Sequence, residues 1–241
     1  MKTWYALLNG PLEDQNHVKR LFTASGYEFD DLDGKFALGA QALESFSDRE
    51  EVIDAATELV ASLNTTLRLS VDRYTGFELH GLLEKRQDGT THRIMFAKGA
   101  AFGIGGASAI GIAGSLSDKI ILSREERLVV LLRKNPEIED IANRMAARPM
   151  TWAAMTTAYE SVAGMMSTKS APDKRRSDYQ GLIDRGWLTL DEAEGFYNTA
   201  AYHRKGYPRT PMRKVTPMSY ETACILTKRL FWRLVDELEP T

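Results

Sequence analysis

Ser123-Arg124-Glu125-Glu126 marks the point at which this sequence changes from strand patterns to helix patterns. Ser123 and Glu126 have the spacing of a capping box, in which each side chain bonds a backbone N–H near the start of a helix. Before this point, short apolar runs are separated by turn residues. After it, apolar residues recur at helical spacing almost to the C-terminus. The sequence therefore predicts two parts with different architectures.

The first part predicts a small α/β module over residues 1–98 with a mostly antiparallel sheet. Its strongest strand patterns run from Thr3 to Leu8, from Leu67 to Val71, from Phe77 to Glu84 and from Thr91 to Ala97. The last two patterns are joined by Gln87-Asp88-Gly89, a strong hairpin signal.

Two shorter strands and one helix complete this module. The short strands are expected at Tyr27 to Phe29 and at Lys35 to Leu38. Ser47 and Glu50 form another capping box, which opens an amphipathic helix with apolar residues on one face from Val52 to Leu63.

Residues 99–122 predict a Gly/Ala-rich connector. Gly99 to Ser117 carries no charge, but its glycines and alanines make it a poor membrane span. Gly103 to Ser108 loosely matches a dinucleotide-binding turn, but the third glycine and the βαβ context are missing. We therefore expect no membrane segment here and no bound cofactor.

Residues 123–241 predict a helical bundle. Cap residues or first-turn prolines mark the expected starts of most of its helices, and the links between the helices are short. The helix starts are expected near Ser123, Pro136, Thr151, Tyr179, Thr189 and Ser219. Together with the N-terminal module, the bundle places the chain in the α+β class.

The most unusual stretch of the second part is Tyr202-His203-Arg204-Lys205-Gly206-Tyr207-Pro208-Arg209-Thr210-Pro211-Met212-Arg213-Lys214. It holds five Lys/Arg, and no acidic residue lies between Glu194 and Glu221. The whole chain has a net charge of −2, but residues 123–241 carry 19 Lys/Arg against 16 Asp/Glu, so this half is basic. A basic segment of this kind favours an anionic partner.

The chemistry of this basic stretch suits RNA or a nucleotide. His203 can give or take a proton near neutral pH, so it is a candidate general acid or base. Phosphate contacts are expected from Arg204, Lys205, Arg209 and Arg213. Base stacking is expected from Tyr202 and Tyr207.

A structural role is the alternative for the same residues. A His-Arg pair at the end of a helix interacts well with the last carbonyl groups and with the helix dipole. The remaining cations can pair with the acidic first half of the chain. The protein would then be a non-catalytic interaction module that forms a homodimer or docks another partner.

Five segments of the second part resemble one known family. They are residues 152–160, 187–189 and 196–200, the His203 stretch, and residues 217–223. This set resembles the HEPN-like helical domains of bacterial proteins, which are associated with RNA and nucleotides. The resemblance implies a bundle and places a functional glutamate at Glu160. Active HEPN ribonucleases carry an arginine a few residues before a histidine, whereas here His203 precedes Arg204.

Other signals concern metals and location. The single cysteine, Cys224, excludes an internal disulfide and a cysteine-based zinc site. Period-two alternation allows His80 and His92 to face one another across the predicted hairpin, but no third metal ligand is identifiable, so we expect surface histidines and no metal. There is no signal peptide pattern, which makes a cytoplasmic location the expectation. No motif for sequence-specific DNA recognition is present.

Overall fold

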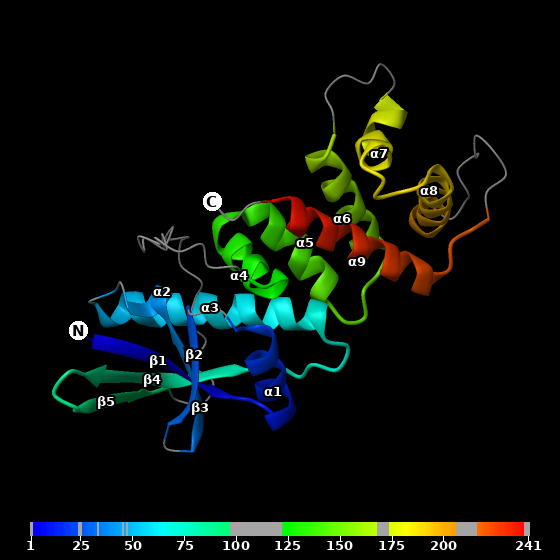
Figure 1. Ribbon diagram of the computed structural model, residues 1–241. Coiled ribbons are helices and arrows are strands. Elements are labelled where there is room, and N and C mark those ends of the chain that lie inside the picture. Colours follow the sequence, from blue (N-terminus) through cyan, green and yellow to red (C-terminus); the bar gives the residue numbers. More distant parts are fainter. Residues whose placement is uncertain are drawn as a thin grey trace. The chain divides into compact units, whose positions relative to one another are not determined.

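The computed structural model describes residues 2–23, 26–32, 34–44, 46, 48–96, 122–167, 174–205 and 216–238. The chain forms two compact units, Met1–Pro136 and Glu137–Thr241 (Figure 1). The first combines a sheet with helices, and the second is helical. The predicted α+β class, with an antiparallel sheet followed by a helical C-terminal part, is therefore confirmed.

The sheet of the first unit has five strands in the order β2-β3-β1-β4-β5, and all neighbouring strands are antiparallel. The strands are β1 (Lys2–Asn9), β2 (Tyr27–Leu32), β3 (Lys35–Ala40), β4 (Glu78–Arg86) and β5 (Thr91–Met95). Helix α1 (Leu12–Leu21) connects β1 to β2, and α2 (Gln41–Glu44) and α3 (Arg49–Ser70) connect β3 to β4. This is the β-α-β-β-α-β arrangement of a split βαβ unit, extended by β5.

The β4–β5 hairpin forms where the sequence predicts it. The Arg86 N–H donates to the Thr90 carbonyl at 2.9 Å, and Asp88 accepts from the Thr90 N–H at 2.8 Å. Gly89 has φ of +80°, a conformation that favours glycine.

Six further helices follow in the described part of the chain. They are α4 (Arg124–Lys134), α5 (Pro136–Ala146), α6 (Trp152–Met165), α7 (Lys174–Asp184), α8 (Leu190–Lys205) and α9 (Tyr220–Glu237). The Ser123 capping box is present, with the Glu126 N–H donating to Ser123 Oγ and the Ser123 N–H donating to Glu126. Thr151 and Ser219 also cap helices through their hydroxyls, as their sequence positions predict.

Helix α3 corrects one predicted strand. Residues 67–70 belong to its last turn, although Leu67, Leu69 and Val71 alternate as in a strand. Leu67 and Leu63 are one helical turn apart and both are buried, so helical packing satisfies the same apolar residues. The helix begins after Asp48, whose side chain accepts from the Glu50 N–H, whereas Ser47 lies outside the described residues.

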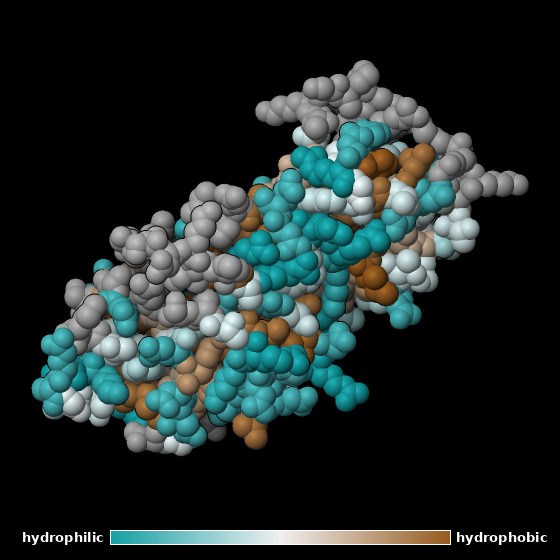
Figure 2. Space-filling view, in the orientation of Figure 1, coloured by the Kyte–Doolittle hydropathy of each residue, from teal (hydrophilic) through white to brown (hydrophobic). Residues whose placement is uncertain are grey.

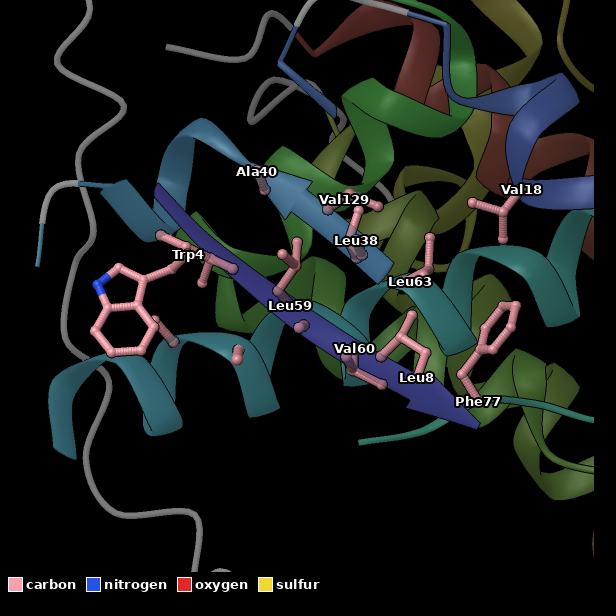
Figure 3. Close-up of a cluster of buried hydrophobic side chains, with 14 of the residues drawn as sticks. Trp4, Leu8, Val18, Leu38, Ala40, Leu59, Val60, Leu63, Phe77 and Val129 are labelled. Carbon is pink, nitrogen blue, oxygen red and sulfur yellow. The ribbon is translucent and has the colours of Figure 1, made fainter. Parts of the chain in front are cut away.

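The main core of the first unit lies between the sheet and its helices. On β1 and β3, Leu8 and Leu38 face the same cluster as Leu59 and Leu63 of α3 (Figure 3). Figure 2 shows one face of each unit. Hydrophilic residues prevail there, and hydrophobic ones form scattered patches. Among the described helices, none combines the length and the apolar character that crossing a bilayer requires.

Helix α4 belongs to the first unit, so the unit boundary follows Pro136 instead of residue 122. Val129 is part of the sheet-side core, and Ser123 Oγ donates to the Leu21 carbonyl at 2.9 Å. The guanidinium of Arg133 acts electrostatically on Tyr27 of β2. The helical pattern of the sequence therefore begins within the first unit, because α4 completes the core of the sheet. The predicted connector residues 99–121 lie outside the described part.

Tyr27 gives the first unit a pH-dependent stability that can be measured. Burial raises the pKa of its hydroxyl to about 12, with Glu126 raising it further and Arg133 opposing the shift. The unfolded state therefore loses this proton before the folded state does, and stability falls as pH rises from about 10 towards 12. Between pH 9 and 11, we expect urea denaturation to show a loss about 1 kcal/mol larger in the wild type than in Tyr27→Phe. Equal losses in the two proteins would contradict this assignment.

Candidate functional site

The second unit holds the residues that the sequence marks for function. Tyr202 and His203 lie in the last turn of α8, and both are exposed. Helix α8 includes the backbone of Arg204 and Lys205, but their side chains, together with Tyr207, Arg209 and Arg213, lie outside the described residues. The site is therefore built from Tyr202, His203 and their neighbours.

His203 stacks on Trp152, the first residue of α6. Their ring centroids are 4.6 Å apart and their planes differ by 9°. The ring of Tyr202 stands edge-on to His203, at 5.6 Å and 87°. Helix α6 begins at Trp152 because the Thr151 hydroxyl accepts from the Ala154 N–H, and this cap fixes the position from which the indole projects.

Tyr220 adds a fourth ring from a third helix. Its ring meets that of Trp152 edge-on, with centroids 6.2 Å apart, and its hydroxyl donates to the Met150 carbonyl. Tyr220 is the first residue of α9, directly after the cap Ser219. We call Trp152, Tyr202, His203 and Tyr220 the aromatic platform.

The surroundings of Tyr220 raise the pKa of its hydroxyl. Desolvation is the largest cause of its raised pKa, Cys224 adds to the shift, and Arg148 acts in the opposite direction. The phenol is a hydrogen-bond donor at neutral pH, as tyrosines ordinarily are, and its bond to Met150 ties α9 to the residues before α6.

The aromatic platform rests on buried rings. Phe196 of α8 lies 6.2 Å from Trp152 and stacks on Tyr159 of α6 at 4.5 Å and 15°. Tyr159 in turn meets Tyr197 edge-on at 5.2 Å. Phe196 and Tyr159 have no exposed surface. These buried rings contact one another in a continuous series, and they support the aromatic platform from the interior of the unit.

Two helix N-termini and one helix C-terminus meet at the aromatic platform, because Tyr202 and His203 lie in the last turn of α8. Ring contact between Trp152 and Tyr220 brings the N-terminal ends of α6 and α9 together, and helix N-termini carry partial positive charge. Arg148 is close enough to act electrostatically on Tyr220. In the sequence, five Lys/Arg follow His203 up to and including Lys214, with no acidic residue among them.

Glu160, the second predicted catalytic residue, lies further along α6. It is exposed, and eight positions separate it from Trp152. At 1.5 Å of rise per residue, this spacing corresponds to about 12 Å along the helix axis. The described contacts bring Tyr202 and His203 together with Trp152, whereas the joint action of His203 and Glu160 stays a prediction.

The expected pairing of His80 with His92 is wrong. In the β4–β5 register, His92 stands opposite Glu84, and the His80 carbonyl accepts from the Phe96 N–H. His80 and His92 are therefore not cross-strand partners. Within the described ranges, no group of three His, Cys, Asp or Glu side chains is arranged to hold a metal ion.

Sequence reasoning missed Trp152 and Tyr220 as site residues. Both lie directly after a cap residue and within the segments that carry the family resemblance, but neither signal indicates that their rings meet at one site. Comparisons with protein-family models, with curated proteins and with solved structures gave no match.

Proposed function

We propose that the second unit binds unpaired RNA or its nucleotides through the aromatic platform. The observation that carries this proposal is the stack of His203 on Trp152, with exposed Tyr202 and Tyr220 beside it. Exposed apolar side chains that lie together mark interaction sites more often than scattered ones do, and here three helices place the rings together.

Stacking accounts for the recognition of bases. Every nucleobase has a π face, so a protein ring can stack on any unpaired base, with about 1–3 kcal/mol lost per base on alanine substitution. In double-stranded RNA the base faces are already covered by neighbouring pairs, and single strands are therefore the better ligand. Tyr202 is 54% exposed and Tyr220 is 44% exposed, so both present ring surface to a ligand.

Two helix N-termini and one guanidinium are available to the phosphates. The N-termini of α6 and α9 and the Arg148 guanidinium lie at the same end of the unit as the rings. Backbone N–H groups at helix N-termini are favourable partners for phosphate oxygens. The acid-free sequence after His203 supports the same ligand class, as does the resemblance of this half to HEPN-like domains.

RNA cleavage is not part of the proposal. The arginine that precedes the histidine in active HEPN ribonucleases is not found here, because the nearest arginine before His203 is Arg185. Glu160 is about 12 Å along α6 from Trp152, on which His203 stacks. Binding therefore has more support than catalysis by His203 and Glu160.

Tyr202→Ala tests the proposal directly. We expect the wild type to bind a short fluorescein-labelled single-stranded RNA in an anisotropy titration, and Tyr202→Ala to bind about 5- to 100-fold more weakly because one stacking surface is lost. Ile225→Ala is the matched control, since Ile225 is an exposed apolar residue of α9 outside the platform. It should bind as the wild type does.

Two outcomes of this titration would contradict the proposal. One is no binding by the wild type at low salt, and the other is binding that salt does not weaken, because phosphate contacts release counterions. If RNA does not bind and light scattering shows that Tyr202→Ala changes the oligomeric state, the non-catalytic interaction function would be favoured.

A further inference from the structure

We propose that His203 itself is the stacking surface for a nucleobase, with an unpaired purine as its preferred ligand. This inference rests on the proposed function and replaces the expected proton-transfer role of His203 with a binding role. It follows from how the imidazole lies, and from which of its sides are occupied.

One face of the imidazole is covered by the indole. A centroid distance of 4.6 Å with planes 9° apart is an offset face-to-face stack, in which the ring edges with Nδ1 and Nε2 point sideways. A base that lies parallel on the opposite face would extend the order Trp152, His203, base. Trp152 occupies only one face of the ring, and the His203 side chain as a whole is exposed.

The neighbouring rings frame this position. Tyr202 stands edge-on to the imidazole, with ring centroids 5.6 Å apart and planes 87° apart, so these two rings do not stack on one another. Trp152 holds the imidazole from below and is itself held by Phe196 and Tyr220. The stacking surface is thus oriented before a ligand arrives, which lowers the entropy lost on binding.

Stack geometry also predicts which base binds best. A purine offers two fused rings to the imidazole and to the neighbouring Tyr202, whereas the smaller pyrimidine offers less ring area. Stacking preferences of this kind come from the contact area and from dispersion, without base-specific hydrogen bonds. We therefore expect oligoadenylate to bind more tightly than oligouridylate.

Three substitutions at His203 separate stacking from charge and from hydrogen bonding. His203→Phe keeps a ring of similar thickness without nitrogen atoms, His203→Gln keeps hydrogen-bonding groups without a ring, and His203→Lys keeps a cation without a ring. With labelled oligoadenylate, we expect His203→Phe to stay within about threefold of the wild type, and His203→Gln to bind about 5- to 100-fold more weakly. His203→Lys should be closer to His203→Gln than to His203→Phe. Because the side chain is exposed, we expect all three variants to stay folded, with His203→Gln and His203→Lys melting slightly below the wild type because they lose the stack on Trp152.

A second measurement reports on the base itself. In a titration with adenosine monophosphate, ring currents from a stacked imidazole should move the adenine H2 and H8 resonances upfield with the wild type and with His203→Phe, but much less with His203→Gln. A purely structural role of His203 would not produce this pattern.

The outcomes distinguish the two proposals. If the wild type binds oligoadenylate and His203→Gln binds equally well, the stacking role of His203 is overturned while RNA binding stands. If His203→Lys binds as the wild type does and His203→Phe does not, His203 acts through charge and the stacking role is also overturned. No binding of either oligonucleotide by the wild type overturns both proposals.

Discussion

Phe196→Ala is expected to lower the unfolding free energy of the second unit by about 3–5 kcal/mol, the usual loss for a fully buried phenylalanine. Phe196 has no exposed surface and contacts Trp152, Tyr159 and Tyr197. Its removal takes away apolar burial, leaves a cavity and ends the stack with Tyr159. The rings of the aromatic platform would then lose their support from below, so RNA binding should weaken as well.

Hydrogen exchange followed by mass spectrometry measures this effect in each part of the chain. In Phe196→Ala, amides of α6 and α8 should exchange faster, whereas those of β1 and α3 should keep their wild-type rates because they belong to the first unit. Phe196→Leu is the matched control, since it keeps most of the apolar volume and should cost less than about 1.5 kcal/mol. Unchanged protection of α6 and α8 in Phe196→Ala would show that the buried rings contribute little to stability.

The parts of the fold that could be predicted are those with local causes. Ser123, Thr151, Thr189 and Ser219 all act as caps at the positions that the sequence indicates, because a cap bonds N–H groups only two or three residues away. The hairpin at Asp88-Gly89 is equally local, since its turn depends on the conformation of those residues.

The parts that were missed have causes distant in the sequence. Leu67 to Val71 satisfies the strand and the helix patterns equally, and only packing against the sheet decides for the helix. Likewise, the helical spacing of α4 gives no indication that Val129 completes the core of the first unit. Local periodicity identifies which residues are buried more reliably than what they are buried against.

The candidate site shows the same division. Tyr202 and His203 stand out in the sequence because they begin an acid-free basic stretch. Trp152 and Tyr220 do not, because their role depends on three helices meeting at one end of the unit. The predicted phosphate contacts of Arg204, Lys205, Arg209 and Arg213 stay predictions, as does stacking by Tyr207.

Asp14→Ala is expected to destabilise the first unit by about 3 kcal/mol or more. Asp14 of α1 is 2% exposed, and its Oδ2 accepts from the Thr75 N–H at 3.1 Å and from the Gly76 N–H at 2.9 Å. Hydrogen bonds to a charged group contribute about 1.5–3 kcal/mol each, and alanine would leave both N–H groups without this acceptor. Asp14→Asn keeps an acceptor without the charge, so its loss should be roughly half as large.

The effect of Asp14 should depend on Asn64, because both residues hold the loop between α3 and β4. Asn64 donates to the Phe77 carbonyl and accepts from the Phe77 N–H, both at 2.9 Å. Once either anchor is lost, the loop can move and the other anchor holds less. In a double-mutant cycle with Asn64→Ala, urea denaturation should therefore give a coupling of about 1–3 kcal/mol, with the double variant less destabilised than the two single losses combined.

The control variant is Asn16→Ala, an exposed position on α1, the helix of Asp14. It should change stability by less than about 0.5 kcal/mol. Additive losses would mean that the loop is held by two independent contacts.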